Sequence, residues 1–387
     1  MKKNDFATFI VYVGMIAIAL LVGLLVIKPI MDTYGASLPI NSILIMVLGL
    51  FAGAILNSVL LELGHILGAK AGKYEILKCV VLGVGVSRAH GKKKFGFYSY
   101  EGLTGETKVA PKDVKNSNLS AYILFPVLFL FVEFIVAMVF IVYCQNTEAS
   151  NPSIAWLHIF MATILASGGI VFLYDLFPAH IESVTDGYLL VLLAKPANKE
   201  AYNNMLVAEA CAFEGKDIPE VPVYTELTDF TASLNLLSVY RHLTDGEPDK
   251  ALPIVEPVLA EGATVSSATK LHFETLKLAI LLEREDRAKA KKMYEELSDE
   301  SKKHITSLAS LTELRAYLLI ASFIEGSESE ANYAIDKAEK LIKACDPNYK
   351  EAEKSLLQYD VDMTRSAHPS WDIYKLPWEE KEESEAK

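Results

Sequence analysis

Glu62 and His65 are the residues of this chain whose types and spacing most directly suggest metal chemistry. They stand at the positions of the glutamate and the second histidine of the zinc-binding motif H-E-x-x-H, in the segment Leu61-Glu62-Leu63-Gly64-His65. In a complete motif the two histidines lie one turn apart on one helix face, and the glutamate serves as a base. Leu61 occupies the first histidine position, and leucine cannot bind a metal ion. The segment therefore offers one candidate ligand, His65, and one candidate base, Glu62.

A second candidate ligand, Asp186, lies far downstream. Asp186 and Gly187 follow Pro178, which should end the preceding apolar helix. An aspartate carboxylate is a known zinc ligand, but Asp-Gly pairs are also common in turns. The position of this pair after the fourth long apolar segment is what makes Asp186 a candidate partner of His65.

Four apolar segments are long enough to span a bilayer, which takes about 20 helical residues. They are Thr8–Ile27, Thr33–Leu61 with a continuation to Ala69, Leu119–Cys144 and Ile154–Tyr174. The first begins like a secretory signal, but it is too long and no small-residue cleavage site follows it cleanly, so we interpret it as a retained anchor. Residues 1–198 are therefore predicted to form a polytopic membrane helical bundle.

Basic residues of the first half are concentrated between the second and third spans. They are Arg88, Lys92, Lys93, Lys94, Lys108, Lys112 and Lys115. Because basic loops remain in the cytoplasm, this loop, both termini and the span ends that carry His65 and Asp186 are predicted on the cytoplasmic side. Within the loop, Ile76–Val86 and Lys94–Tyr100 have the pattern of strands, which predicts a small β-containing structure next to the membrane.

Residues 199–366 have the pattern of a soluble α-helical solenoid. Amphipathic helices recur in pairs at a spacing of roughly 35 to 40 residues, near the tetratricopeptide range. The pairs are Ala232–His242 with Asp249–Ala260, Lys270–Glu283 with Arg287–Leu297, and Leu308–Ile324 with Glu330–Cys345. Such repeats usually bind protein segments. This half is acidic, with a net charge of −14 for residues 197–387 against +2 for residues 1–196, and residues 367–387 are predicted to form an acidic tail.

In residues 40–195 the chain resembles the site-2 protease family of intramembrane zinc metalloproteases. The resemblance rests on Glu62-Leu63-Gly64-His65, on Thr185-Asp186-Gly187 at a suitable separation, and on the segment 91–111, which is similar to a loop of some bacterial relatives. It implies that His65 and Asp186 are zinc ligands and that Glu62 is the catalytic general base.

Leu61 departs from the family pattern. Two protein ligands should hold zinc far more weakly than three, and without zinc no water of lowered pKa would be available for a base to activate. Two residues could replace the missing ligand: Asn57, one turn before Leu61, or His180, shortly before the Asp-Gly pair. Glu133, in the third span, is expected to make a polar contact inside the bundle rather than to take part in catalysis.

Glu62, His65 and Asp186 also have a purely structural interpretation, because they could form a polar cluster where the helices meet. Ionisable residues in a membrane span are costly, however, and usually mark a function or its remnant. We interpret them as the remnant of a site.

Three functions are compatible with these features. The first is a catalytically impaired pseudoprotease that binds membrane segments or a partner protein, and the second is an active intramembrane zinc metalloprotease that cleaves a membrane-bound peptide or regulator. The third is an accessory subunit of a membrane transporter. The basic loop suits anionic membrane lipid, and the helical repeats suit a cytosolic or membrane protein partner. The acidic second half argues against binding of nucleic acid, and the absence of a glycine-rich phosphate loop from the sequence argues against binding of a nucleotide.

Overall fold

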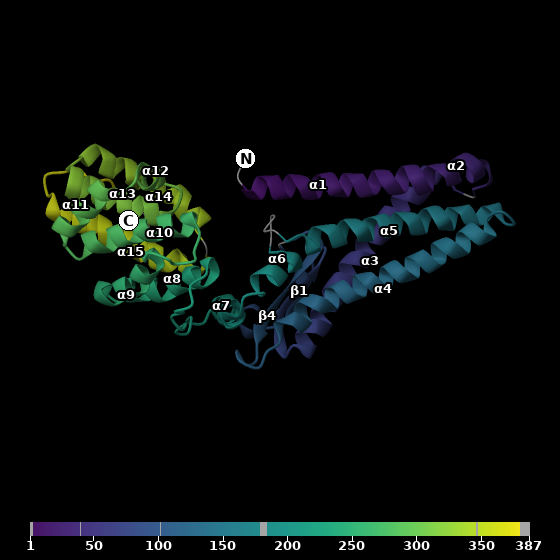
Figure 1. Cartoon of the computed structure of the whole chain (residues 1–387), viewed down its shortest axis with the longest axis horizontal. Coiled ribbons are helices and arrows are strands. Elements are labelled where there is room, and N and C mark those ends of the chain that lie inside the picture. Colours follow the sequence, from purple (N-terminus) through teal and green to yellow (C-terminus); the bar gives the residue numbers. More distant parts are fainter. Residues whose placement is uncertain (1–2, 39, 101, 179–183, 346, 380–387) are drawn as a thin grey trace, which may run out of the picture. The chain divides into compact units, whose positions relative to one another are not determined.

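A computed structural model describes residues 3–38, 40–100, 102–178, 184–345 and 347–379 (Figure 1). The chain divides into two compact units, Met1–Lys216 and Asp217–Lys387. Both are mainly helical, and the first also contains a small antiparallel sheet. The predicted class, mainly α with a small β-containing loop, is confirmed at this level. His180 lies outside the described residues.

The first unit contains the long apolar helices and the sheet. Its elements are α1 (Lys3–Val22), η1 (Gly23–Ile27), α2 (Lys28–Tyr34), η2 (Gly35–Ser37), α3 (Ser42–Ala71), β1 (Tyr74–Val81), β2 (Val84–Ser87), η3 (Ala89–Gly91), β3 (Lys94–Phe97), β4 (Gly105–Pro111), α4 (Leu119–Thr147), η4 (Pro152–Ile154), α5 (Ala155–Leu176), α6 (Asp186–Leu192) and α7 (Pro196–Glu214).

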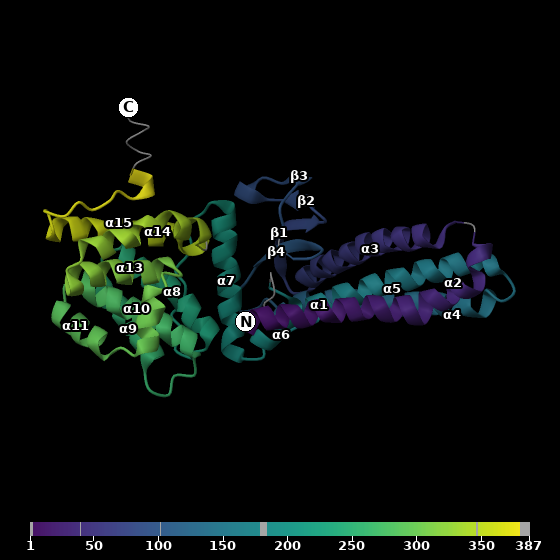
Figure 2. The same ribbon diagram turned by 90° about the horizontal axis from the view of Figure 1, so that it is seen from above.

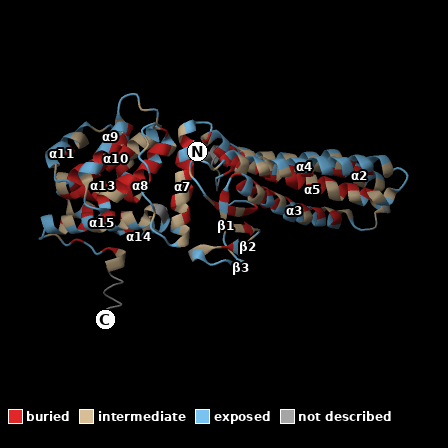
Figure 3. Ribbon diagram, turned by 90° about the horizontal axis from the view of Figure 1, so that it is seen from below, coloured by how far each residue is buried: buried red, intermediate tan, exposed pale blue. Residues whose placement is uncertain are grey.

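Four helices of this unit are long and apolar enough to cross a membrane, as the sequence predicts. They cover Thr8–Tyr34, Ser42–Ala71, Leu119–Thr147 and Pro152–Leu176. The first is longer than expected because the π-helical turn η1 continues α1 into α2, so that Lys28 does not end the helix. Large apolar side chains such as Phe131 and Val139 of α4 are exposed on the outside of the bundle, where lipid would cover them (Figure 3).

The bundle is built around close contacts of α3. Helices α3, α4 and α5 pack against one another, and α1 packs against α5 (Figure 2). A Cβ atom on Gly53 would lie 3.1 Å from the Cα of Ile164 in α5, and one on Gly64 would lie 2.5 Å from the Cα of Pro126 in α4. Small residues of this kind let membrane helices approach closely, which compensates for the lack of a hydrophobic driving force in lipid.

The sheet has the strand order β3-β2-β1-β4, with all neighbouring strands antiparallel. Strands β1 to β3 overlap the two segments predicted to be β, although β1 begins two residues before the first segment and β2 ends one residue after it; β4 was not predicted. Its register pairs Thr107 with Cys79 of β1, and β1 and β4 both pack against α3. The sheet therefore lies at the end of the bundle that contains His65 (Figure 2).

Helix α7 completes the first unit. The side chain of Asn203 accepts a hydrogen bond from the hydroxyl of Tyr74 in β1 at 2.6 Å and donates one to the carbonyl of Val114 at 2.8 Å. Arg88 forms an ion pair with Glu214 at 2.7 Å. Because of these contacts the first unit extends to Lys216, beyond the boundary predicted at residue 198.

The second unit is entirely helical among its described residues. Its elements are α8 (Asp229–Thr244), α9 (Pro248–Leu259), α10 (Ser267–Glu283), α11 (Arg287–Glu296), α12 (Asp299–Thr306), α13 (Leu311–Ile320), η5 (Ala321–Glu325), α14 (Glu328–Ala344) and α15 (Pro347–Ala367). The helices of the predicted pairs are present, and α10 and α13 form the buried centre (Figure 3). Helix α15 packs against both α8 and α13, an arrangement that a simple stack of pairs does not predict.

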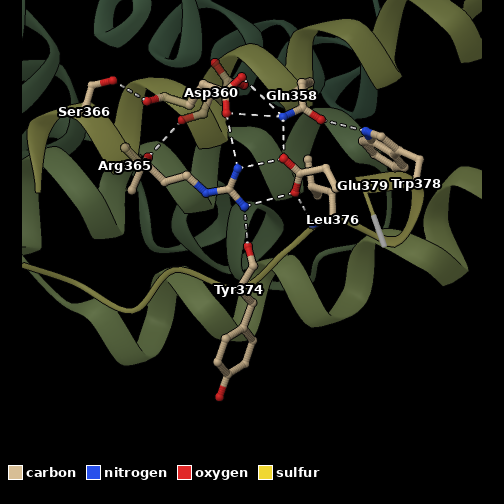
Figure 4. Close-up of polar contacts among 10 residues, drawn as sticks. Gln358, Asp360, Arg365, Ser366, Tyr374, Leu376, Trp378 and Glu379 are labelled. Carbon is tan, nitrogen blue, oxygen red and sulfur yellow. Dashed lines mark hydrogen bonds and ion pairs between the residues drawn. The ribbon is translucent and has the colours of Figure 1, made fainter. Parts of the chain in front are cut away.

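The segment after α15 packs on the unit as far as Glu379, although the sequence predicts a solvated tail from residue 367. Leu376 is fully buried in an apolar cluster with residues of α13, α14 and α15. Arg365 donates to Glu379 at 2.7 Å, and Gln358 donates to the same carboxylate at 2.9 Å and accepts from Trp378 at 2.7 Å (Figure 4). The hydrogen bond from Arg365 is the main reason that the pKa of Glu379 is lowered to about 2. The apolar side chains of Leu376 and Trp378 explain why this otherwise acidic segment packs against the second unit.

A fully buried arginine holds three carboxyl groups inside the second unit. Arg315 of α13 donates to Asp360 at 2.7 Å and to Glu353 at 3.3 Å, both on α15, and also to Glu283 of α10. The cluster thus links three helices, but it contains more carboxyl groups than counter-charges. Burial raises the pKa of Asp360 well above its usual value, and the favourable charge of Arg315 only partly opposes this.

We expect the Asp360→Asn substitution to stabilise the second unit more at neutral than at acidic pH, relative to the wild type. With its pKa raised in the fold, Asp360 stabilises the native state below the ordinary aspartate pKa of about 3.9, and this contribution is lost as the pH rises through the native value. Urea unfolding at pH 5 and pH 7.5 measures the effect in a Trp156→Phe background, where Trp371 and Trp378 of the second unit remain as the only tryptophans. Asp362→Asn, at an exposed position, is the control. An equal change at both pH values would contradict the expectation.

Candidate functional site

Glu62 lies on α3, near the end of the helix that faces the sheet. Its carboxylate is buried, with 2% exposure, and accepts a hydrogen bond from the hydroxyl of Thr107 in β4 at 2.5 Å. A Cβ atom on Gly105 of the same strand would lie 3.0 Å from Oε1 of Glu62. Strand β4 therefore runs directly beside the candidate base. Sequence reasoning missed this strand because Gly105 and Thr107 occupy two of its three buried positions, which leaves only a weak apolar alternation.

His65 and Asp186 meet, although 121 positions separate them in the numbering. Nε2 of His65 lies 3.9 Å from Oδ2 of Asp186, and both side chains are buried. The ring of Tyr122 packs against the imidazole, with 4.9 Å between ring centroids. Nδ1 of His65 and Oδ2 of Asp186 have no hydrogen-bond partner within the described part of the chain. The two predicted ligands are thus adjacent, and each has one possible metal-binding atom that makes no hydrogen bond.

The Asp-Gly pair is fixed by the start of α6. The hydroxyl of Thr185 accepts a hydrogen bond from the amide of Tyr188 at 3.1 Å, as a helix cap, and donates to the carbonyl of Phe177 at 2.8 Å. A Cβ atom on Gly187 would lie 2.1 Å from the carbonyl oxygen of Leu176. Only glycine allows this close approach, which brings Asp186 to the end of α5 and so to His65.

Asp175, which sequence reasoning did not single out, also belongs to the site. Asp175 lies at the end of α5, and its Oδ1 accepts a hydrogen bond from the backbone amide of Asp186 at 3.4 Å. Burial, and after it the charge of Asp175, raise the pKa of Asp186 well above its usual value. A signal was present in the sequence, since Asp175 lies within the last turn of an apolar span, and ionisable residues inside such spans are rare.

Leu61 is packed in an apolar environment. It is 5% exposed and forms a buried cluster with Leu130 of α4 and Val171 of α5. Its side chain is thus part of the interface among the three central helices. The position that a first histidine would occupy is filled by aliphatic contacts.

Asn57 does not replace the missing ligand. It lies eight residues before His65 on α3, which is about 12 Å along a helix axis. Its amide donates to the carbonyl of Gly53 at 2.7 Å. A Cβ atom on Gly168 would lie 3.0 Å from Oδ1 of Asn57 and 2.9 Å from Oε2 of Glu133. Asn57 and Glu133 thus both approach α5 deeper in the bundle, as expected for a polar contact there.

The donor set does not fit a catalytic zinc site. Such a site has three protein ligands, and the residues described around His65 supply two, His65 and Asp186. Within the described chain, no third histidine, cysteine or carboxylate brings its ligand atom within 4.8 Å of both. The site is a buried group of acidic residues and one imidazole, arranged at the end of three membrane-type helices.

The resemblance to a protease family rests on the sequence motifs that contain Glu62, His65 and Asp186. A scan against protein-family models and searches of the curated proteins and of the solved structures found no match to this chain.

Proposed function

We propose that this chain is an integral membrane protein of the site-2 protease type that has lost catalytic competence and binds membrane segments instead of cleaving them. In this proposal Glu62, His65 and Asp186 are the remnant of the catalytic base and two zinc ligands. The observation that carries it is the burial of Leu61 with Leu130 and Val171 at the position of the first ligand. An active protease would need a third ligand, which the described residues do not provide.

Strand β4 supports binding of an extended segment next to the site. It is an edge strand of the sheet, with a strand partner on the β1 side only, and it carries the Thr107 hydroxyl that contacts Glu62. Helix α7 packs against part of this strand, and the carbonyl of Thr107 accepts a hydrogen bond from Tyr122 at 2.7 Å, so an added strand would pair with the remaining main-chain groups. An edge strand can pair with an added peptide strand through its main chain. The client would be a transmembrane or membrane-inserted segment that unwinds at the cytoplasmic end of the bundle.

The β2–β3 hairpin supports contact with membrane lipid. Val84 is paired with Phe97 and Val86 with Phe95, so that four apolar side chains share one face. Phe95 and Phe97 are 76% and 88% exposed. Lys92 and Lys93 lie in the connection of the same hairpin, and Lys94 is the first residue of β3. An apolar face bordered by lysines suits the interface of an anionic, cytoplasmic leaflet, which agrees with the proposed orientation.

The second unit is assigned the role of binding a protein partner on the cytoplasmic side. It has a pocket of about 260 Å³ between α8 and α15, whose lining includes Leu237, Tyr240, Arg241 and Tyr349. Tyrosine and arginine are enriched at protein interfaces. This pocket would accept a side chain of a partner segment.

Photo-crosslinking to a defined probe tests the client-binding proposal. Benzoylphenylalanine replaces Lys108 in β4 in the full-length protein, reconstituted with a synthetic single-span peptide whose apolar helix is interrupted by Gly-Pro. The control carries the same group in place of Lys94, on the opposite edge of the sheet. We expect several-fold more crosslinked peptide from position 108 than from position 94. Equal yields, or none at 108, would contradict the proposal.

A further inference from the structure

A second cluster of ligand-type side chains lies in the second unit. His272 of α10, His304 of α12 and Glu313 of α13 each present one nitrogen or oxygen atom, and these atoms lie within 4.8 Å of one another. Nε2 of His304 is 3.0 Å from Oε1 of Glu313, and Nδ1 of His272 is 3.9 Å from the same oxygen. Three separate helices thus converge on one point.

The separations fit a metal site as well as they fit the ion pairs that the two imidazoles form with Glu313. Donor atoms bound to one tetrahedral zinc at 2.0–2.1 Å lie about 3.3 Å apart, and the two observed separations fall on either side of this value. Oε2 of Glu313 is buried and has no hydrogen-bond partner in the described part of the chain, and Nε2 of His304 contacts Oε1 of Glu313 without forming a well-aligned hydrogen bond. The side chain of Glu313 is only 3% exposed. A buried carboxylate oxygen without a partner is costly, and a bound cation would satisfy it.

The solvent access of the two histidines and the charge of Glu313 also favour the binding of a cation. The side chains of His272 and His304 are 26% and 25% exposed, so that an ion can enter from solvent and keep water as a further ligand. Nε2 of His304 and Nδ1 of His272 both face Oε1 of Glu313, at 3.0 and 3.9 Å, and donors placed in this way favour the charged form of a carboxylate. The carboxylate is therefore available as an anionic ligand.

We propose that His272, His304 and Glu313 bind a divalent transition-metal ion, and that this ion is zinc. Two imidazoles and one carboxylate are a borderline donor set that suits zinc and excludes calcium and magnesium, which prefer oxygen ligands alone. The ion would connect α10, α12 and α13 and so fasten the short helix α12 to the buried centre of the unit. This inference concerns the second unit and does not depend on the function proposed for the membrane unit.

Zinc binding by the full-length protein in detergent provides the test. After dialysis against a chelator, the protein is titrated with zinc in competition with a chromophoric chelator, and cobalt is used in parallel for its visible absorption. We expect one site per wild-type chain and at least a tenfold loss of affinity in His304→Gln and in Glu313→Gln, with loss of the cobalt spectrum. His272→Gln changes a partly exposed position and serves if Glu313→Gln does not fold, as judged by circular dichroism.

Two control variants separate this site from other histidines. His242→Gln removes a partly exposed imidazole of the same unit, which lies 3.3 Å from Glu247. His65→Gln removes the imidazole of the membrane unit. Both should keep wild-type affinity at the proposed site. The proposal is overturned if the wild type binds no zinc, if His304→Gln and His272→Gln bind as well as the wild type, or if His65→Gln abolishes binding.

Discussion

Replacing Arg315 by methionine is expected to lower the free energy of unfolding of the second unit by about 3–5 kcal/mol, the range for breaking a buried ion pair. Arg315 is completely buried and is the shared partner of Glu283, Glu353 and Asp360. Without it, three carboxyl groups on two helices would have to be neutralised by protons or rehydrated. Urea unfolding in the Trp156→Phe background, followed by tryptophan fluorescence, measures the change.

Arg365→Met is the matched control. Arg365 also binds carboxylates, from Asp362 and Glu379, but it is partly exposed at the surface of the unit (Figure 4). Exposed pairs usually contribute up to about 1 kcal/mol. Adding Glu283→Gln and Asp360→Asn to Arg315→Met should recover part of the lost stability, because fewer unpaired charges remain. A loss for Arg315→Met no larger than that for Arg365→Met would show that the buried cluster has no special role.

Leu61→His is expected to add one zinc ion per chain to the content of the wild type. A histidine at this position lies one turn from His65 on the same face of α3, and Asp186 is already 3.9 Å from His65. The variant would therefore supply the third protein ligand. The apo form should be less stable than the wild type, because an imidazole replaces a leucine packed against Leu130 and Val171.

The controls for this substitution come from the same helix and from the second ligand. Leu63→His places a histidine two residues away, at a position that is 38% exposed and outside the apolar cluster, and it should gain no zinc. The double variant Leu61→His/Asp186→Asn should lose the gain. Because zinc is counted relative to the wild type, a metal ion in the second unit does not affect the result. A folded Leu61→His protein without additional zinc would argue against a preserved framework.

Much of the fold follows from local patterns in the sequence. The four long apolar helices are recognised by the length of their apolar runs, whereas the paired helices of the second half and three of the four strands are recognised by their periodicity; each lies close to its predicted position. Strand β4 has only a weak pattern, because Gly105 and Thr107 occupy two of its three buried positions, and its place beside β1 is set by tertiary pairing. The same is true of α15 and of the segment that ends at Glu379, whose burial depends on contacts with distant helices.

The candidate site was predictable in its motif residues but not in its surroundings. Glu62 and His65 have the spacing of a zinc motif, and the later Asp-Gly pair follows them in the order expected for a further ligand. The sequence therefore predicted that His65 and Asp186 would lie close together. Thr107 and Asp175 belong to no recognisable motif. They are part of the site only because the fold places β4 and the end of α5 beside Glu62 and Asp186. The cluster of His272, His304 and Glu313 could not be predicted from the sequence for the same reason, since its three residues come from three helices.

The most direct test of the proposed function is to ask whether the wild-type protein cleaves the peptide that it binds. The single-span peptide that crosslinks at position 108 is incubated without irradiation, with zinc present, and is then examined by mass spectrometry. We expect the peptide to remain intact with the wild type and with Glu62→Gln alike. Cleavage by the wild type that Glu62→Gln abolishes would contradict this account and would identify an active intramembrane protease.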